Sequence, residues 1–195
     1  PDGGHVLYLD AVARSMASIK KAGTPGPHEL PAAYTADNWE NATMVSLDQA
    51  ALSAGWEKLN PGEDGVAKSF QNRMPRMWRA STPGETLTFT FNGTYAAIYD
   101  ILGPDCGQVT VRVDDKELVV IPRFDAYCTY HRLATLTVAS GLPDAVHTVS
   151  IEIHPDQPDK AAILSKRDET MDKPARFDGT NWYAGAVMLL GELVA

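Results

Sequence analysis

The chain has 195 residues and a mass of 21.1 kDa, and its 17 Lys and Arg against 25 Asp and Glu give a net charge of −8. Hydrophobic residues make up 44% and charged residues 22%, a globular composition with enough length for one full domain. The acidic balance argues against nucleic acid or an anionic membrane surface as a partner, because both require clustered Lys and Arg. The longest apolar run, 186–190, is far too short to span a membrane.

The first part of the chain predicts a helix and then a boundary. Apolar residues recur every three to four positions, which predicts a helix over 5–21 with one apolar stripe. The stripe consists of Val6, Leu9, Ala13, Met16 and Ile19. A segment rich in Pro and Gly follows, and such a composition marks a boundary between domains. We therefore expect a terminal helical segment (1–22), a linker (23–35) and a main domain (36–195).

After the linker the apolar period changes from about 3.6 to about 2, the period of half-buried strands. The clearest strands are expected at 86–91, 95–99, 109–113, 117–121, 133–138, 147–153 and 182–194, with shorter ones at 43–47, 56–59 and 75–80. Asn92-Gly93 predicts a tight hairpin turn, and the polar segment 162–177 predicts a long surface loop. Strands separated by Gly, Pro, Asn and Asp turns at intervals of roughly ten residues predict an all-β, antiparallel sandwich.

The sequence holds no established motif for nucleophilic or metal chemistry. It lacks G-x-S-x-G, C-x-x-C and H-E-x-x-H, so neither a metal nor a cofactor is predicted. Cys106 and Cys128 both lie beside expected strands, where they either form one disulfide or stay as two buried thiols. His131 lies three residues beyond Cys128, which leaves a Cys/His enzyme as an alternative hypothesis.

The stretch 1–12 resembles the end of the catalytic domain of SGNH (GDSL-type) hydrolases. In that family an Asp-x-x-His-Pro block is followed by a short polar run, Gly-His and a final helix, and Gly4-His5 with the helix after it match this later part. The resemblance implies that the catalytic serine and dyad lie upstream of Pro1, that His5 is structural, and that the chain is inactive alone. An unrelated helix with a chance Gly-His is the alternative.

The remainder, 36–195, resembles the β-sandwich modules on the C-terminal side of such esterases. The stretches that carry this resemblance are 83–94, 103–114 and 141–151. It implies a jelly-roll, galactose-binding-like antiparallel sandwich with one N-terminal helix. It also implies a non-catalytic accessory role in recognising a glycan or acylated sugar, with the upstream hydrolase domain as partner. Secretion or a periplasmic location follows if the parent enzyme acts on glycans.

Sugars are held by aromatic faces and planar polar side chains, on loops at one end of a sandwich or on a sheet face. Segments 76–78, 123–132 and 181–183 are rich in both kinds of side chain. The candidate sugar-binding residues are Arg76, Trp78, Arg123, Asp125, Tyr127, Tyr130, His131, Arg132, Trp182 and Tyr183. Two alternatives stay open: these residues line the rim of the core, or their face docks on the hydrolase and the domain is purely structural.

Overall fold

A computed structural model describes residues 2–22, 26–27, 29, 31–35, 38–116 and 118–194. Contacts between residues divide the chain into two units, Pro1–Asn38 and Trp39–Ala195. The first unit contains α1 (Asp2–Ile19), so the expected helix is confirmed, although it begins and ends earlier than predicted. Its apolar side chains, Val6 and Leu9 among them, are exposed. Within the linker, 26–27, 29 and 31–35 form neither helix nor strand, and its other residues lie outside the described ones.

The second unit is built mainly from antiparallel strands, which confirms the predicted all-β sandwich. The strands are β1 (Ala42–Ser46), β2 (Ala51–Leu52), β3 (Glu57–Lys58), β4 (Trp78–Ala80), β5 (Thr86–Leu102), β6 (Gln108–Val113), β7 (Val119–Pro122), β8 (Arg132–Ala139), β9 (Ala145–Ile153) and β10 (Trp182–Val194). Two short helices, α2 (Gly65–Phe70) and α3 (Lys160–Ser165), and the 3-10 turns Leu47–Gln49 and Pro174–Arg176 lie between them. No helix among the described residues is long and apolar enough to cross a membrane.

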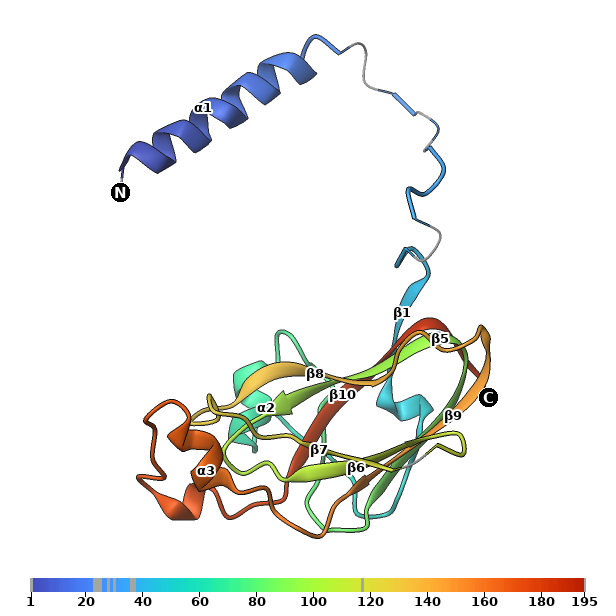
Figure 1. Cartoon of the computed structure of the whole chain (residues 1–195), viewed down its shortest axis with the longest axis vertical. Coiled ribbons are helices and arrows are strands. Elements are labelled where there is room, and N and C mark those ends of the chain that lie inside the picture. The colour runs from blue at the N-terminus through green and yellow to red at the C-terminus, as the bar shows by residue number, and fades with distance from the viewer. Residues whose placement is uncertain are drawn as a thin grey trace. The chain divides into compact units, whose positions relative to one another are not determined.

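The long strands β5 and β10 pair with each other and contribute to both layers of the sandwich. The first half of β5 pairs with β9, which leads on to β6 and β7, while its second half pairs with β8. Figure 1 shows β8 in one layer and β6 and β7 in the other. Alternate residues of the strands point between the layers and form the core, which includes Leu87, Phe89, Phe91, Ile98, Val111, Leu136, Ile151 and Val187.

The expected hairpin at Asn92-Gly93 is wrong, because β5 continues through it without a turn. Gly93 has φ +151° and pairs with Gly191 of β10, which has φ +135°. A Cβ atom on Gly93 would lie 2.1 Å from the Leu190 carbonyl oxygen, and one on Gly191 would lie 2.0 Å from that of Asn92. Glycine is therefore needed for the close approach of two backbones where β5 changes its partner strand.

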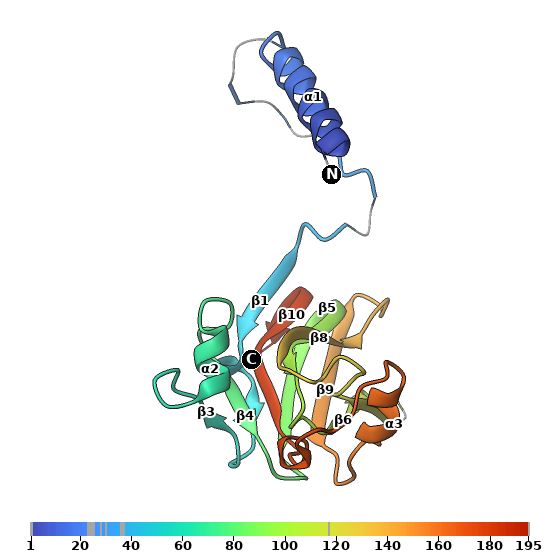
Figure 2. The ribbon, with the colours of Figure 1, turned by 90° about the vertical axis from the view of Figure 1, so that its left-hand side faces the viewer.

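The expected loop over 162–177 is also wrong, because it contains the end of α3 and a 3-10 turn. The side chain of Asp159 caps α3 by accepting from the Ala162 amide at 2.9 Å, and Leu164 and Phe177 are buried beneath it. Asp64 caps α2 in the same way. Helices of this length show too little periodicity to predict. Figure 1 places α2 and α3 toward the same end of the sandwich, and Figure 2 shows them on opposite sides of it.

The close approach of Gly93 and Gly191 predicts an unusually costly substitution. Gly191→Ala adds a Cβ against the Asn92 carbonyl at a φ of +135°, whereas Gly141→Ala adds one in open space at a positive φ of +64°. We expect a loss of about 1–2 kcal/mol for Gly141→Ala and a further ~1–3 kcal/mol for Gly191→Ala, measured by urea unfolding. Equal losses would contradict the steric role of Gly191.

Candidate functional site

An open hollow of about 510 Å³ lies beside α2. We call it the α2 pocket, and it is lined by Asp64, Gly65, Val66, Ser69, Phe70, Arg79, Tyr130, His131 and Tyr183. The helix α2 and its N-cap Asp64 provide the residues between 64 and 70. Strands β4 and β10 provide Arg79 and Tyr183, and the turn before β8 provides Tyr130 and His131. Loops at one end of a rigid sandwich are a usual location for binding residues.

The carboxylate of Asp105 holds two side chains of this pocket in place. Its Oδ1 atom lies 2.6 Å from His131 Nε2, and its Oδ2 atom accepts from the Tyr183 hydroxyl at 2.7 Å and from Asn181 Nδ2 at 2.8 Å. Burial alone would raise the pKa of Asp105, but these hydrogen bonds outweigh it and lower the pKa to about 2. Burial and the charge of Asp105 raise the pKa of Tyr183. The His131 and Tyr183 rings then meet edge to face at 5.7 Å.

The other polar wall of the pocket is formed by Arg79 and Asp64. Arg79 Nε donates to Glu57 at 2.7 Å, and its Nη1 atom donates to Asp64 Oδ2 at 3.2 Å. Asp64 Oδ1 meanwhile accepts from two amides of α2, so the carboxylate joins the helix to β4. The guanidinium is thus fixed in place with its charge balanced by two carboxylates, an arrangement suited to hydrogen bonding with a hydroxyl-rich, uncharged ligand.

Tyr130 supplies an exposed aromatic surface at this pocket, with 56% of the residue accessible. An aromatic face with a few convergent polar groups beside it is a typical feature of a ligand pocket. Together with Arg79, Asp64 and His131, the ring gives the combination of one stacking face and several planar hydrogen-bonding groups that a pyranose ring requires.

A buried lysine fixes the loops behind these residues. Lys160 Nζ donates to the carbonyl oxygens of Pro104 at 3.1 Å, Phe177 at 2.6 Å and Gly179 at 3.0 Å. Burial lowers the pKa of this ammonium group. Lys160 therefore connects α3 to the loop that carries Asp105 and to the segment that leads into β10.

Two of the predicted sugar-binding residues belong to the core instead. Trp182 is 1% exposed and donates from Nε1 to Asp100 Oδ2 at 3.0 Å, and Arg123 is 5% exposed with Nη2 2.7 Å from Asp100 Oδ1. Burial raises the pKa of Asp100, and the positive charge of Arg123 opposes that shift. Neither Trp182 nor Arg123 can reach a ligand, so their assignment to the site is corrected.

The remaining predicted residues are spread over several places. Asp125 pairs with Arg132, and Arg132 and Arg167 lie over the exposed ring of Tyr127, at 5.5 and 3.7 Å from its centroid. These residues form a cluster outside the α2 pocket, which we call the Tyr127 cluster. Trp78 is half-buried against the core, and Arg76 lines a different hollow.

Three of the predicted residues therefore line the α2 pocket: Tyr130 and His131, and Tyr183, which is 2% exposed and forms the buried base of the wall rather than a contact surface. Sequence analysis missed its other polar and aromatic members, Asp64, Ser69, Phe70 and Arg79. Asp64 carried a usable signal, because an Asp before a short run of helix-forming residues is a typical N-cap. Arg79 carried none, since its carboxylate partners come from other segments.

The two cysteines are free thiols, and both are buried. Burial raises the pKa of Cys106 well above its usual range and raises that of Cys128 to about 11. Cys128 contacts Asp125, with its Sγ 3.5 Å from Oδ1. A thiol with a raised pKa is a poor nucleophile, which removes the support for a Cys/His enzyme. Among the residues that the structure describes, no cluster of His, Cys, Asp or Glu could hold a metal ion.

Comparison with solved structures finds a similar fold in other proteins. The chain is similar to the two-domain esterase CEX, active on acetylated mannans, co-crystallized with mannopentaose (TM-score 0.62, 16% identity, 100% of this chain and 47% of that chain). The chain is also similar to a second structure of a two-domain esterase active on acetylated mannans, with a TM-score of 0.63 and 16% identity. That match covers 98% of this chain and 47% of the esterase. A weaker match, with a TM-score of 0.43 and 10% identity, is the CBM36-1 domain of a multidomain xylanase from the hindgut metagenome of Trinervitermes trinervoides. It covers 79% of this chain and 100% of that domain.

These similarities concern the fold, and the chain spans less than half the length of the two esterase structures. No protein-family model matches the sequence. No curated protein sequence matches it either. The chain thus shares its fold with part of two-domain esterases, as the sequence resemblance predicted.

The low pKa of Asp105 predicts a specific loss of stability in acid. A carboxylate whose pKa is lower in the folded state stabilises that state at every pH above 3.8, the ordinary pKa of an Asp side chain. This contribution disappears as the pH falls toward about 2. We expect it to amount to about 2 kcal/mol in the wild type and to be absent in Asp105→Asn, measured by unfolding at pH 5 to 2. The control Asp115→Asn, at an exposed turn, should keep the wild-type slope. An unchanged slope in Asp105→Asn would contradict the network.

Burial of both thiols predicts that they resist alkylation. Iodoacetamide should leave Cys106 and Cys128 unmodified in the folded protein at pH 8 and modify both in denaturant, as read by intact mass. Rapid labelling of Cys128 in the folded state, at the rate of a free thiol, would contradict the assigned burial.

Proposed function

We propose that this chain is a non-catalytic accessory domain of an SGNH-type esterase and that it binds a glycan or acylated sugar in the α2 pocket. The observation that carries the proposal is the exposed ring of Tyr130 beside fixed planar polar groups on Arg79, Asp64 and His131. The fold similarity to an esterase active on acetylated mannans supports the class of ligand. The upstream catalytic domain of such an enzyme would be the partner in the same protein.

The pocket is suited to a neutral ligand. Arg79 is balanced by Glu57 and Asp64, and Asp105 is satisfied by its three side-chain partners, so no unpaired charge is offered to the ligand. The sugar ring would stack on Tyr130, and its neighbouring hydroxyls would hydrogen-bond with Arg79 and Asp64. Because existing contacts already hold these groups, little conformational entropy is lost on binding.

A second candidate function is a structural or docking domain that stabilises the hydrolase without binding sugar. One observation favours it: Leu118 and Val120, which alternate with Val119 and so share one face of β7, are both exposed, as is Val146 of β9. Exposed apolar side chains gathered in one region are typical of a surface that another protein covers. Titration with glycans separates this function from the first.

The test is calorimetric titration of the chain with neutral manno-, xylo- and cello-oligosaccharides and their acetylated forms. Tyr130→Ala should weaken binding by about tenfold or more, because it removes the stacking surface, which corresponds to ~1.4 kcal/mol. Tyr127→Ala removes an equally exposed ring outside the pocket and should leave the affinity unchanged.

The opposite result, with Tyr127→Ala weakening binding and Tyr130→Ala neutral, would move the site to the Tyr127 cluster. Failure of every glycan to bind would support the docking function instead. Hydrolysis of an acetyl ester by the purified chain, abolished by one substitution, would contradict the non-catalytic role.

A further inference from the structure

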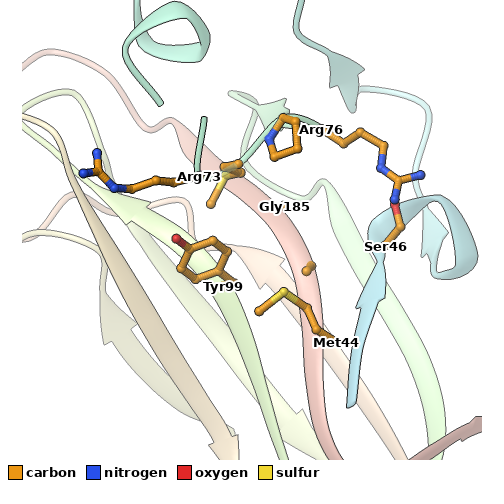
Figure 3. A pocket seen from close by; sticks show the side chains of 9 residues that line it. Met44, Ser46, Arg73, Arg76, Tyr99 and Gly185 are labelled. Carbon is orange, nitrogen blue, oxygen red and sulfur yellow. The ribbon is translucent and has the colours of Figure 1, made fainter. Parts of the chain in front are cut away.

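A second, smaller hollow of about 190 Å³ lies over the outer face of β1, β10 and β5, separate from the α2 pocket in its lining. We call it the arginine hollow. Figure 3 shows Arg73 and Arg76 at its two sides, with Tyr99, Gly185 and Met44 between them. Of its lining residues only Arg76 was among the candidate sugar-binding residues, and the proposed function assigns the hollow no role.

The strand register builds the floor of this hollow. Ser46 pairs with Ala186, and Ala186 pairs with Tyr99, so Ser46 and Tyr99 project on the same side of the sheet, one on either side of β10. Next to Ala186, Gly185 lies at a register irregularity of β10, and a Cβ atom there would lie 2.5 Å from the Met74 side chain. The missing side chain lets the segment before β4 pack down on the sheet and form a wall.

The charge of the hollow is opposite to that of the chain as a whole. Arg76 lies 3.8 Å from Asp48, which is held more closely by Lys58 at 3.0 Å, so one carboxylate faces two cations. Arg73 is exposed, and no described carboxylate forms an ion pair with it. A local excess of positive charge in a protein of net charge −8 is complementary to an anionic ligand.

We propose that the arginine hollow binds a carboxylate-bearing sugar, such as a uronic acid residue of a glycan. Figure 3 shows the hydroxyl end of Tyr99 on the same side as the Arg73 guanidinium, and these two groups would hold the carboxylate. The apolar floor formed by Met44, Gly185 and the Tyr99 ring would take the less polar face of the pyranose. The inference extends the proposed glycan binding to a second site with different charge selectivity.

The charge requirement distinguishes this hollow from the α2 pocket. An ion pair at an exposed site weakens with ionic strength, so binding of the acidic sugar should fall between 20 mM and 500 mM salt, an interval that shortens the screening length by about fivefold. Binding of a neutral glycan in the α2 pocket should change little over the same range.

The experiment is calorimetric titration of the full chain with glucuronic and galacturonic acid oligosaccharides and with their methyl esters. The methyl ester has the same shape without the charge and should bind at least about tenfold more weakly. Arg73→Gln should weaken binding of the acid by a similar factor. Arg112→Gln, which removes the same charge from the exposed side of β6, should bind like the wild type.

The variants separate the two sites. Tyr130→Ala should keep binding of the acid while losing that of neutral glycans, and Arg73→Gln should do the reverse. The inference is overturned if the ester binds as well as the acid, if Arg112→Gln is as harmful as Arg73→Gln, or if Tyr130→Ala alone abolishes binding of the acid. Equal competition by a glutamate-rich peptide would also overturn it, because the hollow would then select charge without selecting a sugar.

Discussion

The carboxylate of Asp105 is the contact on which the arrangement of the α2 pocket depends. It joins the turn before β8, through His131, to Tyr183 of β10 and to Asn181 just before that strand, and the backbone carbonyl of Asp105 accepts from the Asn181 amide at 3.0 Å. Gly179 permits this approach, since a Cβ atom there would lie 2.4 Å from the Asp105 carbonyl oxygen. With a pKa of about 2, the carboxylate stays ionised at any physiological pH, so the wall is formed before a ligand arrives.

The scaffold explains why two differently charged hollows occur on one small domain. β10 contributes Tyr183 to the α2 pocket and Gly185 to the arginine hollow, and the segment between α2 and β4 supplies Arg73 and Arg76. In the α2 pocket every charged group has a protein partner, which favours hydroxyl groups as ligands. In the arginine hollow cations are in excess, which favours a carboxylate. Under the two binding proposals, one small domain would distinguish neutral from acidic regions of a heterogeneous polysaccharide.

Local patterns predicted most of the strands, three of the residues proposed for the site line the α2 pocket, and several of the errors share one cause. The period of two along β6, β9 and the first half of β5 follows from burial on one face, which a single strand reveals on its own. The role of Gly93 depends on Gly191, and the roles of Trp182 and Arg123 depend on Asp100, so no local pattern could show them. The segment 123–132 was correctly recognised as polar and aromatic. Which of its side chains face solvent was decided by residues from distant segments.

The central claim, that a neutral glycan binds in the α2 pocket, is tested most directly by NMR chemical-shift mapping of the full chain during titration with a neutral oligosaccharide. The account predicts that the largest shifts fall on Asp64, Ser69, Arg79, Tyr130 and His131, while the residues of the Tyr127 cluster and of the arginine hollow stay unchanged. Shifts concentrated on Tyr127 and Arg167, or the absence of any shift at saturating oligosaccharide, would contradict it.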